Sequence, residues 1–347
     1  MDAHTGGARA IFALIFAAIV CLGAGLRFAE LSAKPMHGDE ANQALKTGRL
    51  LEKGEYAYDP FEHHGPTLYY LTLPVLWATG TQHFVDTEEW QYRAVPAVFG
   101  VLIVALLWGL RDALGGPATL WAAGLCAVSN AMVYYSRYYI QETLFTCFAL
   151  AAIVLGWHFA QRPGVGKALA LGAALGLVYA TKETSVLLFA AAGAAVCAVV
   201  LWQRMAGGAW PALGAPLRVK YVAACVGVAL IVSVVFYSSF GTHPRGVLDA
   251  VLTYTRYFTR AEGAGSAAAH DKPFLYYLEL LAFCYREPGP WWTEGFALAT
   301  AGLGLLSALF VRGVNTEAET PIAPVHFRRF LAVYAVLLTL VFSAVPY

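Results

Sequence analysis

The 347 residues carry a formal net charge of +1, and 59% of them are hydrophobic while only 13% are charged. Soluble proteins carry about 25% charged residues, so this composition excludes an ordinary soluble domain. So small a net charge gives no reason to expect a nucleic-acid partner. The six cysteines are scattered singly and lack the close pairs of a metal site. The composition therefore predicts a polytopic membrane protein.

Apolar runs long enough to cross a bilayer, about 17 to 25 residues each, recur along nearly the whole chain. Glycines, prolines and charges separate them. The first run is longer than the hydrophobic region of a signal peptide, and no small-residue cleavage pattern accompanies it. We expect an all-α polytopic bundle of about nine transmembrane helices, at 11–28, 93–110, 116–134, 139–160, 167–181, 184–202, 221–240, 295–311 and 328–345.

A large polar loop, at about 30–92, follows the first span. Asp39 and Glu40 open a pattern in which apolar residues recur at helical spacing. Gly54 supplies a stop, because glycine tolerates the left-handed conformation that ends helices. The apolar run 67–77 is too short to cross a bilayer. The loop therefore predicts amphipathic interfacial helices, the first with a carboxylate pair at its N-terminus.

The loops also predict an orientation. The connections carrying Arg162 and Lys167, and Arg204, Arg218 and Lys220, contain no acidic residue. By the positive-inside rule these loops are cytoplasmic, which places the N-terminus inside and the 30–92 loop outside. The same count places Arg137, the turn at Lys182 and the segment 241–294 outside. The polar residues of interest thus share one side of the membrane.

Two interpretations compete for Asp39 and Glu40. Acids favour the first turn of a helix, where they satisfy free N–H groups, so capping alone would explain them. His37, Glu62, His63 and His64 lie in the same loop; a cap does not need them, and their presence favours chemistry. Their spacing matches no metal-ligand motif. We therefore expect no metal and no other cofactor, with a divalent cation as the alternative left open.

Two further charged pairs lie at the ends of spans. Arg137 and Glu142 stand at or just inside the start of one, and Lys182 and Glu183 stand in a turn between two. The tyrosines around Arg137 also fit an aromatic belt with a snorkelling arginine. Charge at membrane depth is costly and tends to be functional. We expect Lys182 and Glu183 either to pair with each other or to face a polar cavity, and we favour the cavity.

The external segment 241–294 carries Arg256, His270 and Lys272 among many aromatic residues. A solvated loop would explain part of its charge. The block from His270 onward favours a groove wall that rests on lipid head groups and holds a phosphate. Lysine suits that anion by charge, and arginine also by its fork geometry.

Together these residues resemble the GT-C superfamily of integral-membrane glycosyltransferases. The chain is most similar to the protein O-mannosyltransferase and aminoarabinose-transferase branch, and within it to the prokaryotic flippase-activity-associated protein family linked to N-glycosylation. The resemblance rests on His37-Gly38-Asp39-Glu40, His64-Gly65-Pro66, Ser136-Arg137 with Gln141-Glu142, Thr181-Lys182-Glu183, and His270 with Lys272-Pro273.

The resemblance implies a single GT-C-like domain over 1–347 that moves a sugar from a polyprenyl-phosphate donor to an acceptor protein, lipid or glycan. The reaction would invert the anomeric carbon on the outer face of the cytoplasmic membrane. Asp39 would be the general base and Glu40 its partner. The substrate and its phosphate would be bound by His64, Arg137, Glu142, Lys182, Glu183, Arg256, His270 and Lys272.

Two alternatives come from other functional classes. The chain could be a non-catalytic partner in a glycosylation machinery, or a component of a lipid-linked-sugar flippase or transporter. A transporter would show broken helices near mid-membrane and internal repeats, and the sequence has no convincing repeat. Relatives usually continue into further spans, so we also expect that the chain is C-terminally truncated.

Overall fold

The computed structural model describes residues 2–61, 64–206, 216–261, 273–285, 287–310 and 324–344. Within these ranges the chain forms helices and turns, and its β-structure is limited to two isolated bridges. The first half contains α1 Asp2–Phe28, α2 Gly38–Lys53, α3 Thr67–Ala78, η1 Phe84–Asp86, α4 Glu89–Leu106, η2 Leu107–Leu110, α5 Arg111–Leu114, α6 Gly116–Val128, α7 Asn130–Tyr135 and α8 Glu142–Gln161. The second half contains α9 Val165–Thr181, α10 Ser185–Met205, α11 Val219–Tyr237, α12 Arg245–Ala261, α13 Tyr276–Ala282, α14 Gly295–Phe310 and α15 Pro324–Ala344.

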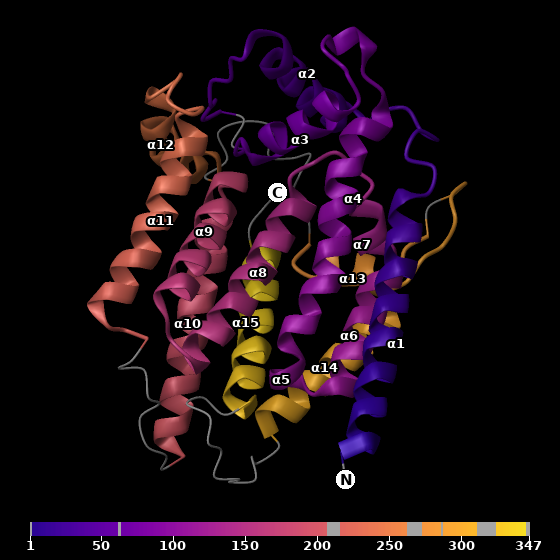
Figure 1. The fold of residues 1–347 in the computed structure, drawn as a ribbon, viewed down its shortest axis with the longest axis vertical. Helices are drawn as coiled ribbons and strands as arrows, with labels where there is room; N and C mark the ends of the chain where they lie inside the picture. Colours follow the sequence, from indigo (N-terminus) through magenta and orange to yellow (C-terminus); the bar gives the residue numbers. More distant parts are fainter. Residues whose placement is uncertain are drawn as a thin grey trace.

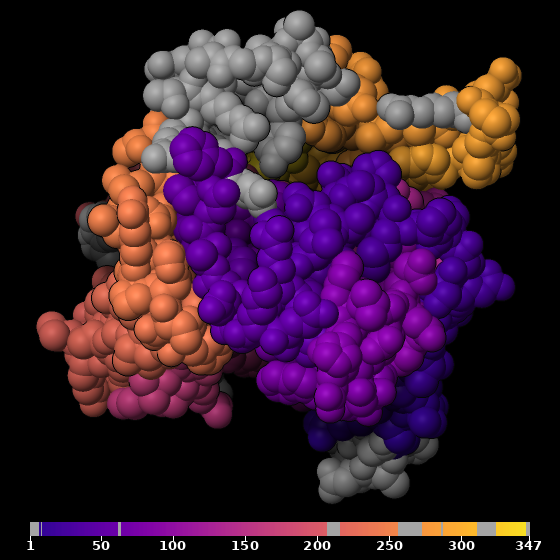
Figure 2. All heavy atoms as spheres, turned by 90° about the horizontal axis from the view of Figure 1, so that it is seen from above, coloured from indigo at the N-terminus to yellow at the C-terminus, as the bar shows by residue number. Residues whose placement is uncertain are grey.

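The long helices form an upright bundle, and α2 and α3 lie across the end opposite the N-terminus (Figure 1). Seen from that end, residues of the first loop cover much of the face, and α12 lies at its edge (Figure 2). One buried cluster joins α2 and α3 to the bundle through residues such as Leu68, Tyr69 and Leu144. A second lies within the bundle around Phe16 and Trp157. The polar loop is therefore a packed cap.

The expected interfacial helices are confirmed. Helix α2 begins at Gly38 and ends before Gly54, whose φ of 64° is the left-handed conformation that the sequence predicted for the stop. Helix α3 spans 12 apolar residues, which is too short to cross a bilayer. Both lie over the bundle end rather than within it (Figure 1).

Six helices of the described residues are long and apolar enough to span a membrane. They are Arg9–Phe28, Glu89–Leu114, Glu142–Gln161, Ser185–Met205, Val219–Tyr237 and Pro324–Ala344. The other three expected spans correspond to the shorter apolar helices α6, α9 and α14. The run 116–134 differs most, because Ser129 ends α6 and caps α7 by accepting the Met132 N–H. The all-α, multi-pass architecture is confirmed.

Candidate active site

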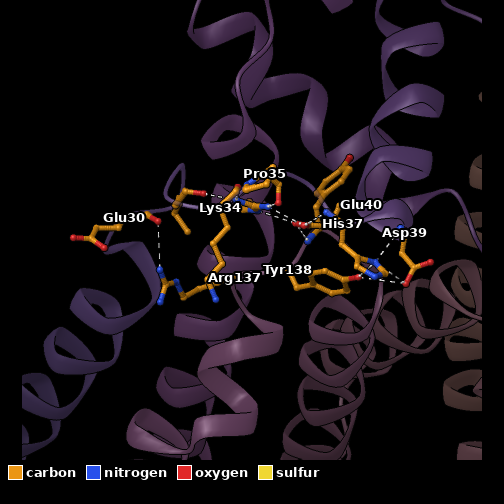
Figure 3. A network of polar contacts seen from close by, with 11 residues as sticks. Glu30, Lys34, Pro35, His37, Asp39, Glu40, Arg137 and Tyr138 are labelled. Atoms are coloured by element: carbon orange, nitrogen blue, oxygen red, sulfur yellow. Dashed lines mark hydrogen bonds and ion pairs between the residues drawn. The ribbon is translucent and has the colours of Figure 1, made fainter. Parts of the chain in front are cut away.

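The N-terminus of α2 presents Asp39 at the capped end of the bundle (Figure 3). His37 is the N-cap residue: its imidazole accepts the Asp39 N–H, and the Glu40 carboxylate accepts the His37 N–H, which completes a capping box. The Asp39 side chain is 70% exposed, and its Oδ2 lies 3.3 Å from the Tyr138 hydroxyl and 3.4 Å from His37 Nδ1. One carboxylate oxygen is thus oriented by the protein while the group remains open to solvent.

Glu40 points the other way and is only 2% exposed. Arg93 forms a bidentate ion pair with it, with Nε–Oε1 and Nη2–Oε2 distances of 2.8 Å, and the Tyr139 N–H donates to Oε1 at 3.0 Å. Burial acts to raise the pKa of Glu40, but the bond from Arg93 and the backbone N–H groups of Tyr139 and His37 outweigh it and leave the pKa below its ordinary value. A catalytic role for Glu40 stays a prediction; its contacts are those of a residue that positions the loop.

Arg93 itself also holds the first loop through the backbone. Its two terminal nitrogens donate to the carbonyls of Leu31, Lys34 and Pro35, at 2.7, 2.8 and 3.2 Å. Sequence reasoning assigned Arg93 no role. The available signal was an arginine at the start of an apolar run, where an unpaired charge would be costly.

Arg27, near the end of α1, is a second buried arginine that sequence reasoning missed. It donates to the carbonyls of Cys126 and Ala127 at 2.8 and 3.0 Å, and its Nε lies 3.3 Å from Ser136 Oγ. These carbonyls belong to the last turn of α6, where backbone carbonyls have no N–H donor within the helix. Arg27 therefore stabilises the break between α6 and α7 and the segment that follows it.

Arg137 does not join the other predicted phosphate-binding residues. Its Nη2 donates to the Ala29 carbonyl at 2.7 Å and to Glu30 at 3.4 Å, which ties it to the end of α1 (Figure 3). The contacts of its side chain are therefore with backbone carbonyls, and a contact between Arg137 and substrate stays a prediction.

Lys182 faces a cavity, as the sequence predicted, but Glu183 is not among the lining residues and the acid that pairs with Lys182 there is Glu142. Lys182 Nζ donates to Glu142 Oε1 at 2.8 Å, and both line a cavity of about 450 Å³ together with Tyr135 and Tyr277. The remaining lining residues are mainly apolar: Ile103, Ala131, Met132, Thr143, Thr146, Thr184 and Phe342. Among the described residues, Glu142 Oε2 is buried without a hydrogen-bond partner. Neither Asp39 nor His64 is among the residues that line this cavity.

His64 and Glu183 lie beside this pair. His64 forms an isolated bridge with Lys182, and its Nδ1 is 3.6 Å from Glu183 Oε2. The close approach depends on Gly65, where a Cβ would lie 2.1 Å from the Ala180 carbonyl oxygen. Glu183 is 4% exposed, and its backbone carbonyl accepts the Tyr254 hydroxyl at 3.1 Å.

Two predicted phosphate-binding residues, His270 and Lys272, lie outside the described residues, and a third, Arg256, is described only in its backbone, within α12. Glu62 and His63 of the first loop also lie outside the described residues. In the part of the chain that the structure describes, no cluster of three His, Cys, Asp or Glu side chains is spaced to hold a metal ion.

Comparison with known proteins adds a family and a fold. The sequence model of the family described as dolichyl-phosphate-mannose-protein mannosyltransferase matches residues 69–248. Among curated proteins, no match is found.

Three solved structures illustrate the fold. The chain is similar to ArnT from Cupriavidus metallidurans in the apo state, with a TM-score of 0.65 and 15% identity over 99% of this chain and 56% of that one. The S. cerevisiae protein O-mannosyltransferase Pmt1-Pmt2 complex bound to the sugar donor has a TM-score of 0.55 and 23% identity over 68% and 34%. Archaeal oligosaccharyltransferase AglB from Archaeoglobus fulgidus, in complex with an inhibitory peptide and a dolichol-phosphate, has a TM-score of 0.53 and 13% identity over 96% and 50%.

This chain therefore spans 34% to 56% of the length of these proteins. The matches confirm the GT-C-like fold that the sequence resemblance implied.

Proposed function

The chain belongs to the dolichyl-phosphate-mannose-protein mannosyltransferase family, and we propose that it transfers a glycosyl group from a polyprenyl-phosphate carrier to an acceptor. Two proteins of similar fold support the choice of donor: the S. cerevisiae complex is bound to the sugar donor, and the archaeal oligosaccharyltransferase holds a dolichol-phosphate. A lipid carrier also suits an enzyme whose polar groups gather at one end of a membrane bundle.

The observation that carries the proposal is the cavity lined by the Lys182–Glu142 pair. Its wall is largely apolar, but it holds an ammonium group and a carboxylate whose Oε2 has no partner among the described residues. A phosphate would find its counter-charge at Lys182, and sugar hydroxyls would donate to Glu142 Oε2. His64 and Glu183 would bind beside them, and Arg137, Arg256, His270 and Lys272 keep their predicted substrate contacts as part of the proposal.

Asp39 is proposed as the general base. It would remove the proton of the acceptor as that nucleophile bonds to the anomeric carbon, while the carbon–oxygen bond to the phosphate breaks and the phosphate leaves with the electron pair. A single displacement of this kind inverts the anomeric carbon. A phosphate is a good leaving group, so the site needs a base and a cation more than an acid.

The proposed location is the outer face of the cytoplasmic membrane. Asp39 and the turn at Lys182 lie at one end of the bundle, and the loops that carry Arg162 and Arg204 lie at the other (Figure 1). The positive-inside rule makes the second end cytoplasmic. No nucleotide sugar is supplied outside that membrane, so a donor there must arrive already activated and lipid-bound.

The test is transfer of radiolabelled mannose from polyprenyl-phosphate mannose in proteoliposomes supplied with a crude membrane extract as acceptor source. We expect Asp39→Asn to lower kcat by about 10²- to 10⁴-fold, the usual contribution of a positioned base, with little change in donor binding. Lys182→Met should instead weaken binding of labelled polyprenyl phosphate. Unchanged transfer by folded Asp39→Asn would refute the base assignment, and no transfer by the wild type would refute the function.

A further inference from the structure

We propose that Tyr138 and His37 act through Asp39 as a proton relay, in which Tyr138 passes the proton from the Asp39 carboxyl to the His37 imidazole. The inference rests on the proposed function and adds two positioning residues to it. It follows from the contacts of Tyr138 with His37 and Asp39 at the start of α2, which helix capping does not require (Figure 3).

The polar atoms of the three side chains form a triangle. The Tyr138 hydroxyl lies 2.6 Å from His37 Nδ1 and 3.3 Å from Asp39 Oδ2, so it touches both groups at once. His37 Nδ1 is 3.4 Å from the same Oδ2. Among the described residues, no polar contact engages Asp39 Oδ1. Oδ2 is therefore held by Tyr138 and His37, and the proposal assigns the acceptor to Oδ1.

The capping contact fixes the direction in which a proton can travel. His37 Nδ1 accepts the Asp39 backbone N–H at 3.3 Å, as an N-cap side chain does. A ring nitrogen that accepts a hydrogen bond carries no proton, so the bonding pattern assigns the neutral ring proton to Nε2. Nδ1 can then receive a proton from Tyr138. The His37 side chain is 67% exposed, so Nε2 has access to water.

Tyr138 suits a relay because it stays protonated. Burial and the nearby Asp39 carboxylate raise the pKa of Tyr138 well above its ordinary value, which disfavours a free tyrosinate. A relay avoids that species, because the hydroxyl receives one proton as it releases another. The other charged or titratable groups facing the network are Glu40, which is paired with Arg93, and Tyr134, whose ring stacks on Tyr138 at 5.8 Å.

The proton balance closes without another reactant. As the acceptor oxygen or nitrogen bonds to the anomeric carbon, its proton moves to Asp39. The Asp39 carboxyl group then rotates about its Cβ–Cγ bond and brings the protonated oxygen to Tyr138. That proton passes to the Tyr138 oxygen while the Tyr138 hydroxyl proton passes to His37 Nδ1. The imidazolium formed releases a proton to water, and exchange with water returns the neutral ring to its Nε2–H form, in which Nδ1 again accepts the Asp39 N–H. An imidazole is a stronger base than a carboxylate, so the relay makes removal of the acceptor proton more favourable than Asp39 alone would.

The experiment compares four variants in the mannose-transfer assay with polyprenyl-phosphate mannose. His37→Asn retains an excellent N-cap side chain but has no basic nitrogen, and Tyr138→Phe keeps the ring. Each should lower kcat about ten-fold with the donor KM unchanged. Adding free imidazole should restore His37→Ala but not Tyr138→Phe. Tyr134→Phe is the matched control and should behave as the wild type.

Each outcome decides the question. Wild-type kcat in both His37→Asn and Tyr138→Phe, or no recovery of His37→Ala with imidazole, would overturn the relay. An equal loss in Tyr134→Phe would assign the effect to ring packing and would also overturn it. Asp39→Asn separates the two proposals: if it is inactive while the His37 and Tyr138 variants are normal, the base assignment stands and only the relay fails.

Discussion

Replacing Arg93 by lysine should loosen the whole first external loop, although Arg93 does not line the cavity. Its guanidinium makes five hydrogen bonds, two to Glu40 and three to backbone carbonyls of the segment before α2. An arginine side chain has five N–H donors and a lysine has three. Lysine therefore leaves at least two of these five hydrogen bonds unmade, even if its ammonium group reaches the same place.

The size of the effect follows from that count. A hydrogen bond to a charged group contributes about 1.5–3 kcal/mol, so the loss of two of them in Arg93→Lys should lower the free energy of unfolding by about 3–6 kcal/mol. Arg93→Met removes every donor and leaves the Glu40 carboxylate buried with only backbone N–H groups. Breaking a buried ion pair in this way costs about 3–5 kcal/mol. Both variants should lower sugar transfer, because the position of Asp39 depends on how this loop is held.

The assay is equilibrium unfolding in detergent micelles, followed by tryptophan fluorescence, on Arg93→Lys, Arg93→Met, Glu40→Gln and the double variant Glu40→Gln/Arg93→Met. Residues in direct contact couple by about 0.5–3 kcal/mol, so the double variant should be less destabilised than the sum of its single changes. An unfolding free energy for Arg93→Lys within about 0.5 kcal/mol of the wild type, the range of an ordinary surface change, would refute the argument. Strict additivity of Glu40→Gln and Arg93→Met would refute the pairing.

Two further predictions concern stability. The pKa of Glu40 lies below its ordinary value of 4.5. The carboxylate therefore stabilises the fold above that pH, and this contribution is lost as the pH falls through the folded pKa. Between about pH 7 and about pH 3, the free energy of unfolding should fall less in Glu40→Gln than in the wild type. In α9, a Cβ at Gly172 would lie 2.2 Å from the Cys225 carbonyl oxygen of α11, so Gly172→Ala should cost about 1–3 kcal/mol. Gly193→Ala in α10 meets nothing within 4 Å and should cost nothing, and equal losses in both would contradict this account of the packing.

Sequence patterns predicted the parts of the fold that local physics controls. The period of α2, its acidic first turn and its stop at Gly54 are all local signals, and the structure reproduces them. The break at Ser129 was missed because apolar composition runs on through α6 and α7. Only the pair Ser129-Asn130, two residues that favour helix caps, could have indicated it.

The site was predictable only as far as charge and membrane side reveal it. The cost of charge near membrane depth correctly marked Lys182 as a residue that needs a partner or a cavity, but the partner in the structure is Glu142 and not the adjacent Glu183. The same reasoning could not choose partners for Arg137 or Glu40. Their partners are a backbone carbonyl for Arg137 and a guanidinium group for Glu40, and both partners are distant in the sequence and brought near only by the fold.

Glu40 connects the proposed base to the cavity. Its Oε1 accepts both Arg93 Nε and the Tyr139 N–H, so the carboxylate fixes the start of α2 against the segment that leads into α8. That segment touches Asp39 through Tyr138 and reaches the cavity at Glu142, four residues later. Four residues span at most about 14 Å even when fully extended. The residue that contacts Asp39 and the residue that lines the cavity therefore lie on one short stretch of chain anchored on Glu40. A change at Glu40 that left Asp39 chemically intact should still misplace the base relative to the donor.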